Sequence, residues 1–483
     1  MSKFESLDKY TNSKSFGYEL LPFKFERLED EIFISNLVGE FKILSQNEFE
    51  AFVNNHLPFE SKTYSDLLAK HFIIEKNTST PLELLSLKLR TKLSRLSQFT
   101  ALHMFVVSLR CEHSCPYCQV SRQSDNKIAF DMTPEIADRA LELTFRSPSP
   151  AIKIEFQGGE PLLNFPIIQH IVRSALEINK VAQKNLAFVI ATNLAVLSDD
   201  VLSFCKSNNV EISTSLDGPR ELHNSNRPRP NNNSYELAIE GIRKARDYLG
   251  VDHVSALMTT TKASLGQVKN IIDEYIKQDF SGIFLRPLSP YGFAIKTKWY
   301  KSYDVDEWLK FYFEGLDYII ELNRNGLKFQ EFYARMILTK MLTPYQTGYV
   351  DMMSPAGAGI AAVVYNYDGD VFASDESRML AEMGDKSFRL GNVLTNTYRE
   401  IFTNDFLLDA LEKSFTGSAP MCSNCAFEPY CGSDPVYHHA TQGDVLGKKW
   451  ESGFCQRNLS IFRKLIEYYQ DPEIKRIFES WLR

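Results

Sequence analysis

Between residues 98 and 330 the chain alternates six short apolar runs with helical patterns, and this alternation limits its fold more than any other feature. The runs are rich in β-branched and aromatic residues and lie at Leu102–Ser108, Ile152–Phe156, Ala187–Ala191, Glu211–Ser215, Val254–Met258 and Ile283–Leu285. Continuous apolar strands that alternate with helices are typical of a parallel sheet covered on both faces. The pattern predicts an α/β fold with a partial (β/α)6 barrel, whose functional side chains lie in the loops after the strands.

Two further regions flank this segment, and 483 residues at roughly 150 per domain predict about three domains. We place them at residues 1–97, 98–330 and 331–483. The first region has strand-like runs at Phe23–Leu28, Ile32–Asn36 and Glu40–Leu44. Gly39 marks a hairpin, and Ser45 with Glu48 has the capping-box spacing that starts a helix. This order predicts an N-terminal winged-helix-like module. In the third region, Asp368-Gly369 between two apolar runs predicts another hairpin.

The composition argues against two classes of function. Lys and Arg number 54 against 61 Asp and Glu, a net charge of −7, which argues against a nucleic-acid binder that depends on a basic surface. No apolar run approaches the roughly 20 residues that span a bilayer, and Met1–Leu21 lacks the apolar core of a signal peptide. We expect a cytoplasmic protein without nucleic-acid or membrane partners, whose eight cysteines are reduced thiols or metal ligands.

Three of these cysteines directly follow the first strand of the alternating region. Cys111, Cys115 and Cys118 have the spacing C-x3-C-x2-C, so their thiolates can converge on one metal centre. Zinc and a complete 4Fe–4S cluster each take four protein ligands, so three cysteines leave one iron of a cluster open to substrate or cofactor. The spacing favours an iron–sulfur cluster over the alternative, a zinc site completed by His113 or by a distant residue.

This spacing, with Tyr117 before the last cysteine, resembles the signature of the radical S-adenosylmethionine (SAM) superfamily. The resemblance implies that the open iron binds SAM, whose one-electron reduction gives a 5′-deoxyadenosyl radical that abstracts a hydrogen atom from the substrate. Gly158, Gly159 and Glu160 look like the family's GGE motif, which implies that Glu160 holds the methionine amino group. Arg227 lies in a run that resembles the H-x3-R-P element, which implies a pairing with the methionine carboxylate.

Polar groups after the third and fourth strands complete the cofactor site that the resemblance implies. They are suited to the ribose, while Leu257 and Met258 would line the adenine. The full set of cofactor-binding candidates is Tyr117, Gly158, Gly159, Glu160, Asn193, Ser213, Ser215, Asp217, Arg227 and Leu257. The resemblance covers about residues 98–290.

Four cysteines form a second group near the C-terminus: Cys422, Cys425, Cys431 and, after a gap, Cys455. Four thiolates can close a site for zinc or for one complete 4Fe–4S cluster, and the ligand count does not choose between them. A zinc ribbon is the structural alternative, but a radical enzyme upstream favours iron and sulfur. The remaining cysteine, Cys205, lies in a helical pattern and is expected to be a buried free thiol.

The region around this second group resembles the SPASM domain, which usually carries seven cysteines and two auxiliary clusters. At the three other cysteine positions of that domain this chain has Ala356, Ser374 and Pro435. The resemblance implies that one auxiliary cluster is missing and the other kept, giving two 4Fe–4S clusters in total. Asp375 is a candidate catalytic base, because sulfatase-maturing relatives use an aspartate there, although an aspartate after a hairpin is more often a turn or cap residue.

Taken together, the motifs look closest to the radical SAM peptide maturase of the His-Xaa-Ser system. This implies a ribosomally made precursor peptide as substrate and a reducing electron donor such as flavodoxin or ferredoxin. The N-terminal pattern resembles modules that bind leader sequences by adding a strand to a sheet edge. The alternatives are a sulfatase-maturing enzyme that generates formylglycine, and a non-catalytic metal-containing protein that binds peptides or carries electrons.

Overall fold

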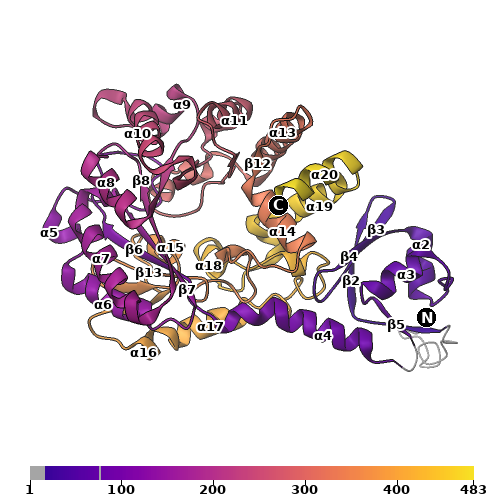
Figure 1. Cartoon of the computed structure of the whole chain (residues 1–483). Coiled ribbons are helices and arrows are strands. Elements are labelled where there is room, and N and C mark those ends of the chain that lie inside the picture. The colour runs from indigo at the N-terminus through magenta and orange to yellow at the C-terminus, as the bar shows by residue number, and fades with distance from the viewer. Residues whose placement is uncertain (1–16, 76–77, 483) are drawn as a thin grey trace. The chain divides into compact units, whose positions relative to one another are not determined.

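The structure is a computed structural model that describes residues 17–75 and 78–482 (Figure 1). Most of the N-terminal segment in which no signal peptide was expected therefore lies outside the described residues. The chain forms two compact units. Unit 1 contains the described part of Met1–Ser94 together with Thr339–Gln346 and Pro420–Cys431, and unit 2 contains Arg95–Leu338, Thr347–Ala419 and Gly432–Arg483. These units do not coincide with the three consecutive domains expected from the sequence, which remain a prediction.

Unit 1 is built on an antiparallel sheet of three strands, β2 (Phe23–Leu28), β3 (Glu31–Asn36) and β4 (Phe41–Ser45). Gly39, with a φ of 79°, lies in the turn between β3 and β4, as predicted. The predicted capping box of Ser45 and Glu48 starts α2 (Gln46–Val53). The other elements are β1 (Tyr18–Leu20), α3 (Lys62–Ala69), β5 (Ile73–Glu75) and α4 (Thr80–Leu93). The strands and helices are confirmed, while the winged-helix class stays a prediction.

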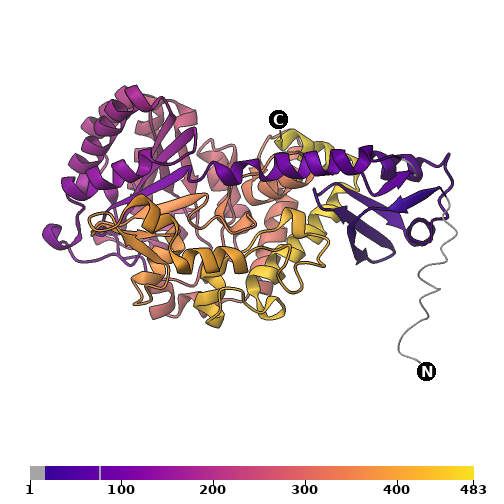
Figure 2. The same ribbon diagram turned by 90° about the horizontal axis from the view of Figure 1, so that it is seen from below.

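The segment that carries Cys422, Cys425 and Cys431 packs on this sheet within unit 1. Ser35 of β3 donates to the carbonyl of Ala426 at 2.5 Å, and the Tyr430 hydroxyl donates to the carbonyl of Gly39 at 2.8 Å. α4 reaches the same turn, because Lys92 Nζ donates to the carbonyl of Val38 at 2.9 Å. Figure 2 shows the start of this helix beside the strands of unit 1. The N-terminal sheet and the C-terminal cysteine segment therefore form one folded body.

Unit 2 contains a mixed sheet of eight strands in the order β10-β9-β8-β7-β6-β13-β14-β15. Its strands are β6 (Leu102–Ser108), β7 (Ala151–Gly158), β8 (Asn185–Thr192), β9 (Val210–Ser215), β10 (Val254–Leu257), β13 (Ala362–Tyr365), β14 (Asp370–Phe372) and β15 (Arg389–Asn392). β6 to β10 are parallel, which confirms the first five predicted strands and the α/β class.

Helices cover the outer face of these parallel strands (Figure 1). Thr133 caps α6 by accepting from the Ile136 amide at 3.3 Å, and Pro134 occupies its first turn, as expected for a helix start. The helices between the strands are α5 (Lys127–Phe130), α6 (Pro134–Phe145), α7 (Phe165–Ala182), α8 (Asp199–Asn208), α9 (Arg220–Asn226), α10 (Ser234–Leu249) and α11 (Val268–Lys277). They match the predicted alternation.

The sixth predicted strand does not join this sheet. β11 (Gly282–Ile283) pairs instead with β12 (Gln330–Glu331) in a separate two-stranded sheet. Just beyond this short ladder, the Leu285 amide donates to the carboxylate of Glu331 at 3.2 Å. The sheet nevertheless contains six parallel strands, because β13 pairs parallel with β6, and the predicted hairpin adds the antiparallel β14 beyond it.

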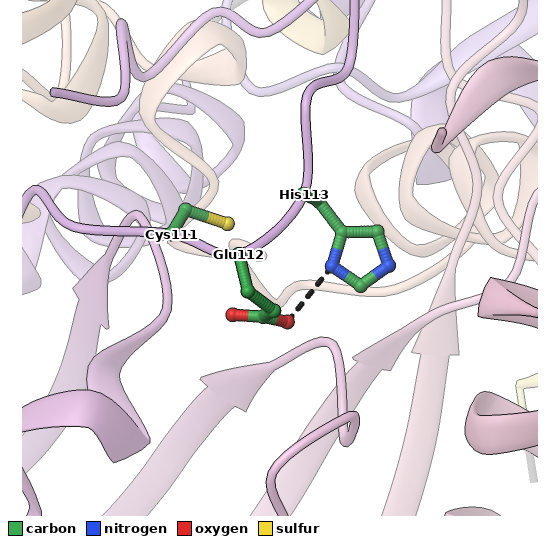
Figure 3. Close-up of side chains that lie close together, drawn as sticks. All are labelled: Cys111, Glu112 and His113. Carbon is green, nitrogen blue, oxygen red and sulfur yellow. Dashed lines mark hydrogen bonds and ion pairs between the residues drawn. The ribbon is translucent and has the colours of Figure 1, made fainter. Parts of the chain in front are cut away.

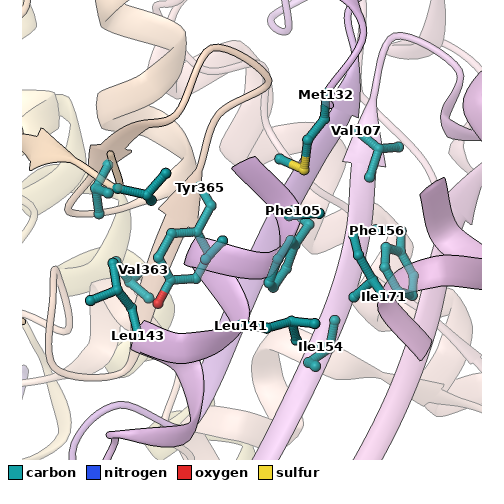
Figure 4. Packing of buried hydrophobic residues seen from close by; sticks show 14 of the residues in the cluster. Phe105, Val107, Met132, Leu141, Leu143, Ile154, Phe156, Ile171, Val363 and Tyr365 are labelled. Carbon is teal, nitrogen blue, oxygen red and sulfur yellow. The ribbon is translucent and has the colours of Figure 1, made fainter. Parts of the chain in front are cut away.

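The hydrophobic core joins the parallel strands to this hairpin (Figure 4). Phe105 of β6 packs against Tyr365 of β13 with ring centroids 5.0 Å apart, and both are fully buried. Cys205 belongs to the same core and is buried, as expected. Because β13 supplies core residues beside β6, residues 347–419 belong to the same compact unit as the parallel strands.

The remaining helices follow the parallel strands along the chain. They are α12 (Phe293–Lys296), α13 (Val305–Arg324), α14 (Phe332–Leu342), α15 (Asp375–Ala381), α16 (Tyr398–Phe402), α17 (Asp405–Lys413), α18 (Pro435–Gln442), α19 (Gly453–Tyr469) and α20 (Pro472–Trp481). Among the described residues, none of the helices combines the length and apolar character needed to cross a membrane.

Candidate active site

The first cysteine group lies in the loop after β6, where all three thiols are half-buried. Among the described residues, Cys111, Glu112 and His113 are the one set of three potential ligands whose atoms lie within 4.8 Å of one another (Figure 3). The thiols of Cys111, Cys115 and Cys118 are therefore spread more widely than the sulfurs of one tetrahedral zinc, which lie about 3.8 Å apart when each Zn–S bond is about 2.3 Å. The three sulfurs are therefore not gathered as closely as the ligands of an assembled zinc site.

His113 is held by protein groups at both ring nitrogens. Nδ1 lies 2.8 Å from a carboxylate oxygen of Glu112 and 3.1 Å from the Asn193 amide, and Nε2 lies 2.7 Å from the Ser234 hydroxyl at the start of α10. Figure 3 shows the ring turned toward Glu112. These contacts tie the loop to α10 and leave the imidazole poorly placed to complete a zinc site.

Gly158 and Gly159 allow the end of β7 to lie against the start of the cysteine loop. The Gly159 amide donates to the Ser108 carbonyl at 2.8 Å, and the Glu160 amide donates to the Arg110 carbonyl at 2.7 Å. A Cβ on Gly158 would lie 2.0 Å from the Ser108 carbonyl oxygen, and one on Gly159 would lie 2.3 Å from that of Arg110. Only glycine fits here, so the pair has a structural role in addition to the predicted cofactor role.

Glu160 links the ends of β7 and β8. Its fully buried carboxylate accepts from the Leu162 amide at 3.0 Å, the Thr192 hydroxyl at 2.7 Å and the Asn193 amide at 2.8 Å. Burial, reinforced by the charge of Glu112, raises the pKa of Glu160 to about 8. A nearby cation would favour the ionised form. A buried carboxylate of this kind is compatible with the ammonium group that the family resemblance implies, and that role stays a prediction.

Asp217 and Arg227 form a buried ion pair beneath the cysteine loop. Arg227 donates through Nε and Nη2 to both carboxylate oxygens, at 2.9 and 3.1 Å, and Tyr117 donates to the same carboxylate at 2.6 Å. Burial works to raise the pKa of Asp217, but the charges of Arg227 and His223 and the hydrogen bonds outweigh it and lower that pKa. Arg227 was expected to pair with a cofactor carboxylate, and its Nη1 is the nitrogen that stands outside the pair with Asp217.

The residues assigned to the ribose and adenine lie on two neighbouring strands. Ser213 and Ser215 of β9 stand two residues apart, so they share one face of the sheet, and Leu257 of β10 is paired with Ser215. Leu257 remains 40% exposed at the end of its strand, whereas Met258 is buried. Ser213, Ser215 and Leu257 thus lie together, as the sequence predicted for successive strand ends.

Three residues stand where the SPASM domain has the cysteines that this chain lacks, and each is part of the ordinary packing or capping of the fold. Ala356 is fully buried, Ser374 is buried and caps α15, and Pro435 stands in the first turn of α18. Asp375, the catalytic candidate, is the first residue of α15, and its carboxylate lies 3.4 Å from the guanidinium of Arg378. Its catalytic role stays a prediction.

Sequence reasoning missed three carboxylates that line one cavity of unit 2: Asp351, Glu376 and Asp434. Burial raises the pKa of each to about 7, and their mutual repulsion adds to the effect. Glu376 is adjacent to Asp375, and Asp434 lies in the run after Cys431, so each was close to a residue that had been singled out. Their spacing in the chain carries no signal that they meet.

Comparison with known proteins agrees with this geometry. Residues 105–274 match the Radical SAM superfamily model. The cysteine-type anaerobic sulfatase-maturating enzyme of Clostridium novyi is 22% identical over 372 residues, which are 73% of this chain and 92% of that protein. The radical SAM cyclopropyl synthase TigE of Paramaledivibacter caminithermalis is 24% identical over 209 residues, 39% of this chain and 40% of that protein.

Solved structures share the fold. Native anSMEcpe with bound AdoMet superposes with a TM-score of 0.65 at 18% identity, covering 79% of this chain and 99% of that one. Streptococcus suis SuiB bound to its precursor peptide SuiA superposes with a TM-score of 0.53 at 15% identity, covering 91% of this chain and 100% of that one. Residues 105–274 thus form a radical SAM domain, and the curated relatives of the chain include sulfatase-maturating enzymes.

Proposed function

We propose that the protein is a radical SAM maturase that modifies a side chain of a ribosomally made precursor peptide. The proposal rests on the close backbone packing of Gly158 and Gly159 against the start of the loop that contains Cys111, Cys115 and Cys118. That contact places a three-thiol loop beside polar groups from the neighbouring strand ends, where a cofactor with amino, carboxylate and hydroxyl groups fits.

The three thiols would hold a 4Fe–4S cluster with one open iron, and the strand ends would hold SAM. When bound, the two groups supply reductive cleavage of SAM and hydrogen-atom abstraction from the substrate. Glu160 would accept hydrogen bonds from the amino group of SAM, and Nη1 of Arg227 would donate to its carboxylate. Ser213 and Ser215 would bind the ribose, and Leu257 would cover the adenine.

The four C-terminal cysteines would hold one auxiliary 4Fe–4S cluster. This part of the proposal rests on the spacing of Cys422, Cys425, Cys431 and Cys455 and on the kind of enzyme that precedes them. The residues at Ala356, Ser374 and Pro435 support a single auxiliary cluster, because none of the three offers a thiolate. Such a cluster requires a reducing compartment and a donor such as flavodoxin or ferredoxin, in keeping with a cytoplasmic enzyme.

A peptide of the His-Xaa-Ser type is the substrate that we propose, and the support comes from the sequence motifs. Two similar solved structures hold peptides: SuiB is bound to the precursor peptide SuiA, and anSMEcpe is bound to the Kp18Cys peptide. The second candidate is formylglycine formation, which is favoured by the curated sulfatase-maturating relatives and by Asp375 at the start of α15.

Mass spectrometry of a precursor peptide encoded beside this chain, co-expressed with it, tests the proposal. We expect a mass change on the peptide with the wild-type chain and none with a Cys115→Ala chain. A new aldehyde on serine or cysteine would favour the second candidate. An unchanged peptide beside a chain that cleaves SAM would contradict the proposed substrate.

A further inference from the structure

A cavity in unit 2 lies apart from the residues assigned to SAM. It has about 590 Å³ of empty space, part of it open to solvent. Its charged lining residues are Arg286, Asp351, Glu376, Asp434 and Arg457, and none of the predicted cofactor-binding residues is among those that line it. Leu288 lines the cavity and also packs with Tyr117 and Cys115. The cavity therefore borders the cysteine loop, where a substrate side chain would have to reach.

The charges inside this cavity do not balance. Three carboxylates, Asp351, Glu376 and Asp434, face two guanidinium groups. Arg286 Nη2 lies 3.9 Å from a carboxylate oxygen of Glu376, too far for a hydrogen bond. When all five groups are ionised, one negative charge is left over, and an uncompensated charge in a partly buried site is costly. One positive charge would complete the set.

Two buried polar groups in the cavity wall also lack a partner within the described part of the chain. The Tyr291 hydroxyl and the Trp308 indole nitrogen make no hydrogen bond, although the side chains are only 1% and 2% exposed. The tyrosine oxygen can accept from a cation, whereas the indole N–H can only donate and would need a carbonyl oxygen of the peptide. Unsatisfied buried groups of this kind are rare because each costs free energy. The carboxylates of Asp434, Glu376 and Asp351 help to raise the pKa of Tyr291, after burial itself. The hydroxyl thus faces the same space as the three acids.

The spacing of the carboxylates argues against a metal ion. Among the described residues, Asp351, Glu376 and Asp434 do not form a set whose oxygens lie within 4.8 Å of one another. Most of the remaining wall is aromatic, with Phe284 stacked on Tyr333 at 5.6 Å. Dispersed carboxylates and aromatic rings suit an organic cation, which gains both hydrogen bonds and cation–π attraction.

A wider groove shares residues with this cavity. Pro287, Leu288, Trp308, Tyr437 and Arg457 line both, and the groove contains about 1360 Å³ of empty space, including open solvent. The acidic residues along the groove outnumber its basic ones; they are Asp304, Asp306, Glu307 and Glu451, against Lys301 and Arg457. An extended peptide in the groove could therefore place one side chain in the cavity.

We propose that this cavity binds one positively charged side chain of the peptide substrate: lysine, arginine or protonated histidine. The inference rests on the proposed function, and it adds a specificity site to it. The cation balances the three carboxylates, donates to the Tyr291 hydroxyl and lies against the aromatic wall. An acidic side chain is excluded by the same charges.

Binding of three blocked pentapeptides to the full-length chain with reconstituted clusters, under anaerobic conditions, tests this inference. The peptides are acetyl-Gly-Ser-X-Ser-Gly-amide with lysine, norleucine or glutamate at X, and isothermal calorimetry measures their affinities. We expect the lysine peptide to bind at least tenfold more tightly than the norleucine peptide, and the glutamate peptide to bind most weakly. Equal affinities, or no measurable binding of the lysine peptide, would overturn the inference.

The variant Glu376→Gln removes one carboxylate without changing the shape of the side chain. We expect it to reduce the preference for lysine over norleucine by about tenfold. The matched control is Glu382→Gln, which lies at the end of the same helix and does not line the cavity. An unchanged preference in Glu376→Gln, or an equal loss in the control, would contradict the assignment.

This experiment does not depend on catalysis. If the chain cleaves SAM but shows no charge preference, the inference about the specificity site is wrong and the proposed function stands. If the chain prefers the lysine peptide but cannot cleave SAM, the proposed function is wrong and the cavity is still a cation site.

Discussion

Arg227 and Asp217 form a two-point ion pair that lies under Tyr117, with N···O distances of 2.9 and 3.1 Å. Asp217 is fully buried, and the side chain of Arg227 is 14% exposed. Tyr117 donates a hydrogen bond to the same carboxylate. The Arg227 guanidinium also lies over the Tyr117 ring, with its central carbon 5.6 Å from the ring centroid. One buried pair thus supports the residue between Cys115 and Cys118.

Replacing Asp217 with asparagine should destabilise the protein strongly. The substitution leaves the Arg227 charge buried without its partner, and breaking a buried pair in this way costs about 3–5 kcal/mol. Chemical denaturation of the two chains measures the difference. The control Asp247→Asn removes an exposed pair with Arg243, so it should cost less than about 1 kcal/mol. Equal small effects would show that the buried pair is not a stabilising element.

Gly159→Ala should prevent the first cluster from assembling. The added Cβ would lie 2.3 Å from the Arg110 carbonyl oxygen, so the cysteine loop must move. Iron analysis after reconstitution should show a loss of about four irons per chain. Gly266→Ala is the matched control, because a Cβ there meets nothing within 4 Å. Full iron loading of Gly159→Ala would show that close packing at Gly159 is not needed to hold the cysteine loop.

His103 should make the folded state sensitive to acid. Burial lowers the pKa of this imidazole to about 4, from an ordinary value of 6.5. Between these values the unfolded chain takes up a proton that the folded chain does not, so stability falls as the pH drops from about 6.5 toward 4.

Urea denaturation at pH 7 and pH 5 measures this effect. From pH 7 to pH 5 the wild-type chain should lose about 2 kcal/mol more than a His103→Gln chain, since one pKa unit corresponds to about 1.4 kcal/mol. The same loss in both chains would show that the acid sensitivity comes from other groups.

The iron content of the reconstituted protein tests the second group of cysteines. The wild-type chain should hold about eight irons, four in each cluster, and Cys425→Ala about four. Stoichiometric zinc together with about four irons in the wild-type chain would instead assign the C-terminal cysteines to zinc.

Local spacing explains why much of the fold and the cysteine loop could be predicted. The alternating apolar runs gave the first five strands of the sheet, and the capping box of Ser45 and Glu48 gave the start of α2. A strand was predicted near Ile283, but its pairing with β12 outside the main sheet could not be anticipated, because β12 lies more than 40 residues further along the chain. Likewise, the sequence alone does not reveal that Asp217 is the partner of Arg227, because the two side chains meet only when the fold buries them together.

The cavity lay beyond sequence reasoning for the same reason. Arg286, Asp351, Glu376, Asp434 and Arg457 come from five separated segments, and their charges are ordinary surface charges until the fold gathers them. The hairpin of β13 and β14 was predicted, but its position beside β6 was not, since strand order depends on contacts between distant residues.

The cleavage of SAM by the reduced, anaerobically reconstituted chain tests the central claim most directly. Chromatography should show 5′-deoxyadenosine with the wild-type chain and with Cys205→Ala, whose thiol lies in the hydrophobic core. Cys115→Ala should form none. Absence of 5′-deoxyadenosine from a wild-type chain with fully loaded clusters would contradict the account.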